Sequence, residues 1–94
     1  MTREIWVELR KTIRLTAMPS AADIALRKTF FMSAAPAYGL TIKDGGDSYV
    51  VTEVAYDIGN NCFIAYTQNE SATSGKSADE VRLAWVAKGW EVRS

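Results

Sequence analysis

The N-terminal segment alternates between apolar and polar side chains. From residue 4 to residue 17, apolar residues occupy one parity, interrupted by Lys11: Ile5, Val7, Leu9, Ile13, Leu15 and Ala17. Trp6, Arg10 and Arg14 lie on the other parity. Successive side chains of a strand point to opposite faces, so this pattern predicts a long half-buried strand with a polar outer face.

The next segment has two interpretations. Ser20 is a favourable helix N-cap, Asp23 suits the positive end of a helix dipole, and apolar residues follow at four-residue spacing. We therefore predict a helix from about Ala21 to Met32, which ends before Pro36. The alternative is a second strand that forms a hairpin with the first, because apolar residues also alternate here: Ile24, Leu26, Phe30 and Met32.

The middle of the chain predicts a three-stranded antiparallel meander. Leu40 and Ile42 suit a short strand, and the sequence Asp-Gly-Gly-Asp at residues 44–47 is a tight turn. Residues 49–56 are rich in Val, Thr and Tyr, which favour strands. After a second turn at residues 59–61, residues 62–67 form the third strand. Residues 68–76 are polar and predict a loop.

The strongest local signals surround the last predicted helix. Ser77 and Glu80 have the spacing of a capping box, and Gly89 stands where a left-handed residue ends a helix, with Trp90 as its hydrophobic contact. The residues between them predict a broad apolar face: Val81, Leu83, Ala84, Trp85, Val86 and Ala87. Residues 91–92 suit a short edge strand.

These elements predict the α+β fold class. We expect an antiparallel sheet of about four strands with two helices on one face, in the order β-α-β-β-β-α, plus the short C-terminal strand. The 94 residues fit a single small domain over residues 1–94, and 48% hydrophobic residues suffice for a modest core.

The residues available for chemistry argue against an enzyme. The sequence contains no histidine, which removes the commonest general base and metal ligand. Cys62 is the single cysteine, so no internal disulfide and no multi-cysteine metal site is expected. Residues 74–77 read Ser-Gly-Lys-Ser, but the first glycine of a phosphate-binding loop is replaced by Glu70. We expect no catalytic residues, no cofactor and no metal.

Charge and hydropathy limit the environment of the protein. Eleven basic and eleven acidic residues give a formal net charge of zero, which disfavours nucleic acid as the partner. The sequence shows neither a secretion signal nor a membrane-spanning run, so we expect a cytoplasmic protein that does not bind membranes. Low net charge also favours self-association, most simply as a homodimer.

The expected function is binding to another protein. Residues 1–34 hold six basic and three acidic side chains, whereas residues 44–80 hold seven acidic and one basic. Trp6 beside Arg10 and Arg14 combines residue types that are enriched in binding hot spots, and Glu53 and Asp57 share a face of an acidic strand. We therefore predict a small non-enzymatic protein-binding module, acting as a regulatory, inhibitory or accessory protein.

Three other interpretations remain open. Trp6 could be packed under the C-terminal residues, with the arginines paired to Glu8 or to the acidic half of the chain. The N-terminal strand and following segment could bind nucleic acid through Trp6, Arg10, Arg14, Arg27 and Lys28. The chain could also be a self-assembling structural component, because a small sheet has edges that must be covered or paired.

Overall fold

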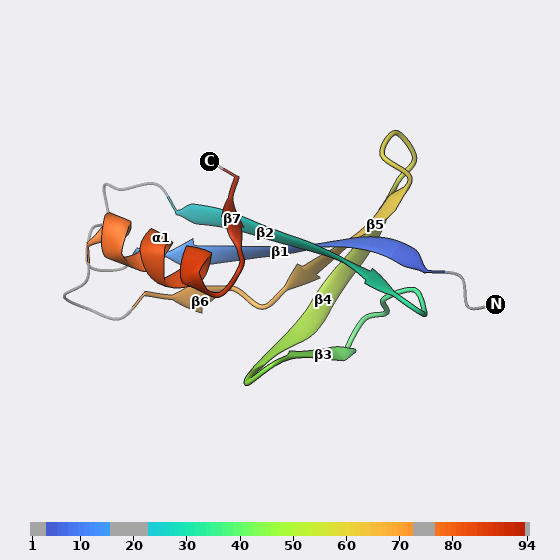
Figure 1. The fold of residues 1–94 in the computed structure, drawn as a ribbon, viewed down its shortest axis with the longest axis horizontal. Helices are drawn as coiled ribbons and strands as arrows, with labels where there is room; N and C mark the ends of the chain where they lie inside the picture. The colour runs from blue at the N-terminus through green and yellow to red at the C-terminus, as the bar shows by residue number, and fades with distance from the viewer. Residues whose placement is uncertain (1–3, 16–22, 73–76, 94) are drawn as a thin grey trace. The chain divides into compact units, whose positions relative to one another are not determined.

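The computed structural model describes residues 4–15, 23–72 and 77–93 of the chain. These residues form seven strands and one helix (Figure 1). In chain order the elements are β1 (Ile5–Arg14), β2 (Ile24–Met32), β3 (Thr41–Asp44), β4 (Asp47–Asp57), β5 (Cys62–Thr67), β6 (Glu70–Ser71), α1 (Ala78–Ala87) and β7 (Glu91–Val92).

The predicted fold class is wrong in two respects. Strands dominate the described residues, and α1 is the one helix among them, whereas we expected two helices on a sheet of about four strands. The sheet is also mixed rather than antiparallel, because β1 pairs in parallel with β5 and with β6. The predicted meander is present within it, since β3, β4 and β5 pair antiparallel in sequence order.

The helix predicted from Ala21 to Met32 is instead strand β2, so the hairpin alternative was correct for the described part. Ile24 and Leu26 are buried on one parity, and Leu26 lies opposite Val92 of β7. Alternate burial of this kind requires a strand, and it outweighs the local helix signals at the start of the segment. The predicted N-cap at Ser20 lies outside the described residues.

Strand β1 confirms the alternation found in the sequence. Val7, Leu9 and Ile13 are almost fully buried, while Trp6 and Arg14 on the other parity are exposed. Lys11, which interrupts the apolar parity, is buried with the same face and is 4% exposed. The interruption therefore leaves the strand intact, because the ammonium group finds a partner in Glu70 at 3.3 Å.

The chain divides into two compact units, and strands β1 and β2 contribute to both. Unit 1 comprises residues 1–10 and 29–68. Its strands lie in the order β3-β4-β5-β1-β2, and β1 and β2 run in opposite directions (Figure 1). A bulge between Val51 and Glu53 interrupts the pairing of β4 with β5. The core of unit 1 is apolar: Val7, Leu9, Ile42, Tyr49, Val51, Cys62, Ile64 and Ala65.

Unit 2 comprises residues 11–28 and 69–94. In it β6 pairs with the end of β1, and β7 pairs antiparallel with the start of β2. The core of unit 2 collects side chains from its strands and from α1: Ile13, Leu15, Ile24, Leu26, Val81 and Trp90. None of the described helices is long and apolar enough to cross a membrane.

Helix α1 begins and ends at the predicted residues. The Ser77 hydroxyl accepts a hydrogen bond from the Glu80 amide at 3.2 Å. At the other end Gly89 has a φ of +95°, and the amides of Gly89 and Trp90 donate to the carbonyls of Val86 and Trp85, which is a Schellman motif. The predicted apolar face is narrower than expected, because Leu83 and Val86 are exposed and Val81 is the buried helix residue.

Candidate functional site

A groove in unit 1 opens where β1 and β5 stop pairing. Their parallel ladder begins at Val7 and Phe63, and Ile5 and Trp6 precede this first pair on β1. The groove has a volume of ≈ 320 Å³, which is at the small end of the range for ligand pockets. We call it the aromatic groove, and its lining residues are Glu4, Ile5, Trp6, Phe31, Tyr56, Asn61 and Phe63.

Two pairs of aromatic rings contribute to the aromatic groove. The rings of Trp6 and Phe31 meet edge to face, with centroids 4.5 Å apart and planes at 73°. The rings of Tyr56 and Phe63 have centroids 4.9 Å apart and planes at 57°. Phe63 lies opposite Val7 in the ladder and shares its face, whereas Trp6 points to the other face. The two pairs therefore approach the groove from opposite faces of the sheet.

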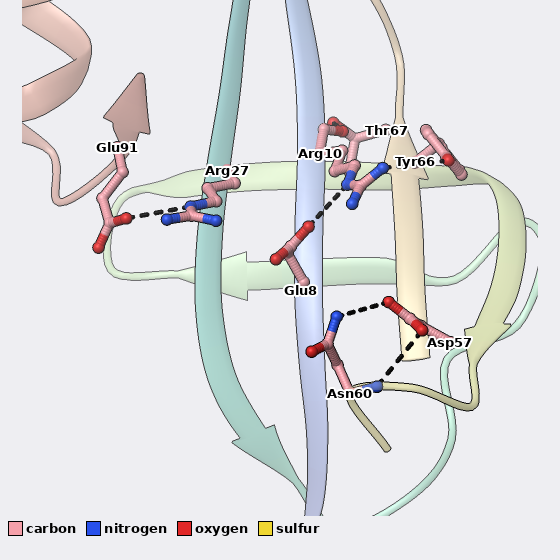
Figure 2. A network of polar contacts seen from close by, with 8 residues as sticks. All are labelled: Glu8, Arg10, Arg27, Asp57, Asn60, Tyr66, Thr67 and Glu91. Carbon is pink, nitrogen blue, oxygen red and sulfur yellow. Dashed lines mark hydrogen bonds and ion pairs between the residues drawn. The ribbon is translucent and has the colours of Figure 1, made fainter. Parts of the chain in front are cut away.

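The turn between β4 and β5 holds one side of the aromatic groove. The Asp57 carboxylate accepts a hydrogen bond from the Asn60 side chain at 2.7 Å (Figure 2). This bond and a second one from the backbone amide of Asn60 lower the pKa of Asp57. The next residue, Asn61, has a φ of 51°, a left-handed conformation that Asn adopts more readily than most residues. Asn61 accepts a hydrogen bond from the Tyr56 hydroxyl, which fixes that ring.

A row of polar side chains crosses the outer face of unit 1. Arg10 and Glu53 both lie opposite Tyr66, one through the β1–β5 ladder and the other through the β4–β5 ladder. The Arg10 guanidinium pairs with Glu8 at 2.6 Å (Figure 2) and lies over the Tyr66 ring, 5.8 Å from its centroid. The pairing of an arginine with Glu8, which was part of the packed interpretation, is therefore confirmed for Arg10.

The five residues predicted as a binding surface are partly brought together. By strand alternation Trp6 and Arg10 share the outer face of β1, and Glu53 and Asp57 share the corresponding face of β4. Trp6 is 39% exposed, so it remains available for contact, and it is the one of the five that lines the aromatic groove. Arg14 belongs to unit 2, where its carbonyl accepts a hydrogen bond from the Ala72 amide.

Large exposed apolar side chains are concentrated in unit 1. In the aromatic groove Phe31 is 55% exposed and Tyr56 is 49% exposed. Outside it, Tyr38 and Ile58 are more than four-fifths exposed. Single exposed apolar residues are common on protein surfaces, but several aromatic residues around one concave site mark an interaction surface.

Cys62 opens β5 as a buried residue, close to Asp57 and Glu8. Burial raises the pKa of the Cys62 thiol, and the charges of Asp57 and Glu8 raise it further. A raised pKa keeps the thiol protonated and poorly nucleophilic. Within residues 4–15, 23–72 and 77–93, no three metal-ligating side chains cluster closely enough to hold an ion.

Sequence reasoning missed most residues of the aromatic groove. Phe31 was assigned to a helix, and the alternation of Ile24, Leu26 and Phe30 was the signal that would have placed it on the opposite face of a strand. Tyr56 and Phe63 were placed in the correct strands, but their approach depends on the cross-strand register, which periodicity does not specify.

No family model matches the chain, and neither the curated proteins nor the solved structures give a significant match.

Proposed function

We propose that the protein is a small binding module that recognises a basic segment of a partner protein through the aromatic groove. One observation carries this proposal: four aromatic side chains line a single concave site whose one charged lining residue, among those described, is Glu4. Aromatic residues supply most of the energy at protein interfaces, because they bury a large area with few rotatable bonds.

The charge of unit 1 supports a basic partner. By sequence unit 1 contains six acidic and three basic residues. Its described arginine, Arg10, already pairs with Glu8. Complementary charge accelerates encounter and suppresses unsuitable partners, so a segment with an apolar side chain next to Lys or Arg fits this site. The same charge disfavours the nucleic-acid alternative at Trp6, since phosphates would approach an acidic unit.

Selection from a displayed peptide library tests the proposal. We expect immobilised protein to enrich peptides that combine a large apolar residue with lysine or arginine. Binding of these peptides should be lost in Trp6→Ala and in Tyr56→Ala. Tyr38→Ala is the matched control, because Tyr38 is an aromatic residue of unit 1 that is 82% exposed and lies outside the groove. Circular dichroism should show that all three variants remain folded.

Three outcomes would contradict the proposal. No enrichment of any peptide would remove the binding function, and enrichment of acidic peptides would reverse the expected complementarity. Peptides that bind Trp6→Ala and Tyr56→Ala as tightly as the wild type would place the binding surface elsewhere. Low-salt gel shifts with single-stranded DNA would test the nucleic-acid alternative in parallel, and binding there that requires Trp6 would favour it.

A further inference from the structure

The aromatic groove is lined by four aromatic side chains and one acidic residue and, among its described lining residues, by no basic side chain. We infer that it binds a quaternary ammonium group, supplied by a trimethylated lysine of the partner segment. This inference rests on the proposed function and specifies the side chain that the groove recognises. Aromatic faces carry a negative quadrupole, and cages of such rings are a general means of recognising alkylated ammonium ions.

The electrostatics around the aromatic groove favour a cation. Glu4 lines it directly, and Asp57 ends the strand that carries Tyr56. The carboxylates of Asp57 and Glu8 both act on Cys62, which directly precedes Phe63, so they place negative charge beside this end of β5. Arg10 pairs with Glu8 at 2.6 Å and offsets the charge of that carboxylate, so Asp57 is the unbalanced charge of the two. The acidic residues at and beside the groove, Glu4 and Asp57, therefore favour a cation over an anion.

The groove has few hydrogen-bond acceptors, which favours a methylated ammonium group over an unmodified one. An unmodified lysine carries three N–H donors, each of which needs an acceptor once it leaves water. The side-chain acceptors among the lining residues are the Glu4 carboxylate, the Asn61 amide oxygen and the Tyr56 hydroxyl, and the last two already hydrogen-bond to each other. A trimethylated ammonium carries no donor and presents methyl groups to the rings, so it loses little on entering.

The rings are held in place before a ligand binds. Trp6 and Phe31 support each other edge to face. Tyr56 is fixed at its hydroxyl by Asn61, whose left-handed backbone belongs to the turn that Asp57 and Asn60 close. Preorganised walls reduce the entropy lost on binding. The ≈ 320 Å³ volume suits the head of one side chain rather than a large ligand.

A titration with matched small probes tests the cation preference. The probes are acetylated and amidated trimethyl-lysine, the equivalent lysine, and choline with its neutral isostere 3,3-dimethylbutanol. The readout is the indole resonance of Trp6, assigned with Trp6→Phe. We expect trimethyl-lysine to bind at least about tenfold more tightly than lysine, and choline to bind more tightly than its isostere by a similar factor. Equal binding of choline and isostere would overturn the cation preference.

Variants separate this inference from a general apolar site. Tyr56→Ala should abolish the Trp6 shift, Glu4→Gln should weaken trimethyl-lysine binding several-fold, and Tyr38→Ala should leave it unchanged. Glu4 is exposed, so Glu4→Gln is expected to fold and keeps the test decisive if Tyr56→Ala does not. Undiminished binding by Glu4→Gln would show that its carboxylate has no part in recognition.

Different results would contradict the trimethyl-lysine inference and the proposed function. Selected basic peptides that gain affinity when their lysine is trimethylated would support the inference. Peptides that bind but gain nothing would overturn it and leave the proposed function intact. Choline that binds as tightly as the trimethylated peptide would overturn the protein source, since the peptide chain would then contribute nothing. Failure of both peptides and choline up to about 10 mM would overturn both proposals.

Discussion

Unit 1 and unit 2 share strands β1 and β2, yet they treat their aromatic side chains in opposite ways. In unit 2 Trp90 is 1% exposed and packs edge to face against Trp85 of α1. In unit 1 Trp6 and Phe31 also meet edge to face, but both remain substantially exposed. Both units contain part of β1 and part of β2. The difference in exposure therefore comes from the other elements, which are a capped helix in unit 2 and hairpins in unit 1.

The two units also differ in charge. Unit 1 has an excess of three acidic residues, and unit 2 has an excess of three basic residues, so the formal charge of zero conceals a separation. In unit 2 the buried charge of Lys11 is paired within the unit. Its ammonium group pairs with Glu70 and lies 5.9 Å from the centre of the Trp85 ring. Unit 2 thus uses an aromatic ring and a cation to stabilise its own core. We propose that unit 1 offers its rings to the cation of a partner.

The largest expected effect comes from exchanging the two tryptophans for alanine. Trp90→Ala removes a fully buried side chain and should lower the free energy of unfolding by about 3–5 kcal/mol. Trp6→Ala removes a partly exposed ring and its contact with Phe31, which should cost about 1 kcal/mol. Urea unfolding measures the loss of stability in both variants. The dependence of the free energy of unfolding on urea concentration should match that of the wild type, so that the midpoints can be compared. Equal losses would show that Trp6 belongs to the core and that the contrast between the units is false.

The end of α1 should be the next most sensitive position. Gly89 has a φ of +95°, and an added Cβ would meet the Lys28 ammonium at 3.2 Å. Gly89→Val should therefore cost about 1–2 kcal/mol, since a β-branched residue is strained in left-handed space. Gly46→Ala is the control, because Gly46 has open space around it and no positive φ. If melting temperatures show no difference between these two variants, the Schellman motif does not stabilise unit 2.

Local signals predicted unit 2 better than unit 1. Ser77, Gly89 and Trp90 act within a few residues of chain, so their spacing fixed the start and end of α1. The strands of unit 1 were also recognisable, but their neighbours were not. The parallel pairing of β1 with β5 joins residues more than fifty positions apart, and no periodicity encodes such a partner.

The error at β2 has a specific physical origin. Ser20, Asp23 and the alanines satisfied the rules for a helix start, and those rules concern local hydrogen bonds. Ile24 and Leu26 are buried, and Leu26 pairs with Val92 of β7, which lies more than sixty residues later in the sequence. Tertiary burial decided the structure against local propensity. Phe31 was misplaced for the same reason, and the aromatic groove could not be anticipated without it.

A smaller effect is expected at the buried lysine of unit 2. Lys11→Met keeps the length of the side chain and removes the ammonium, so the change in stability should be within about 1 kcal/mol in either direction. Glu70→Gln should destabilise more than Lys11→Met, because it leaves the ammonium buried while removing the charge that faces it. Glu70 is half exposed, so the loss should be modest. Thermal unfolding of both single variants and the double variant separates the effect of each side chain from the interaction between them. A larger loss of stability in Lys11→Met than in Glu70→Gln would show that the ammonium itself is required.

The smallest expected effect concerns the turn that supports the aromatic groove. The hydrogen bonds from Asn60 lower the pKa of Asp57, so the folded state favours the carboxylate. A depressed pKa stabilises the fold above the unfolded pKa of about 3.9, and that stability is lost as the pH falls through the folded pKa.

Asn60→Ala removes the side-chain bond, so it should be less stable than the wild type at pH 7. The difference should shrink at a second, acidic pH chosen below the lowered folded pKa of Asp57, where the carboxyl is protonated in both proteins. Urea unfolding at the two pH values, with an NMR titration of the Asp57 carboxyl, measures this. A difference that is the same at both pH values would mean that Asn60 acts through the backbone of the turn, and that the Asp57 charge does not help to hold Tyr56 and Asn61 at the groove.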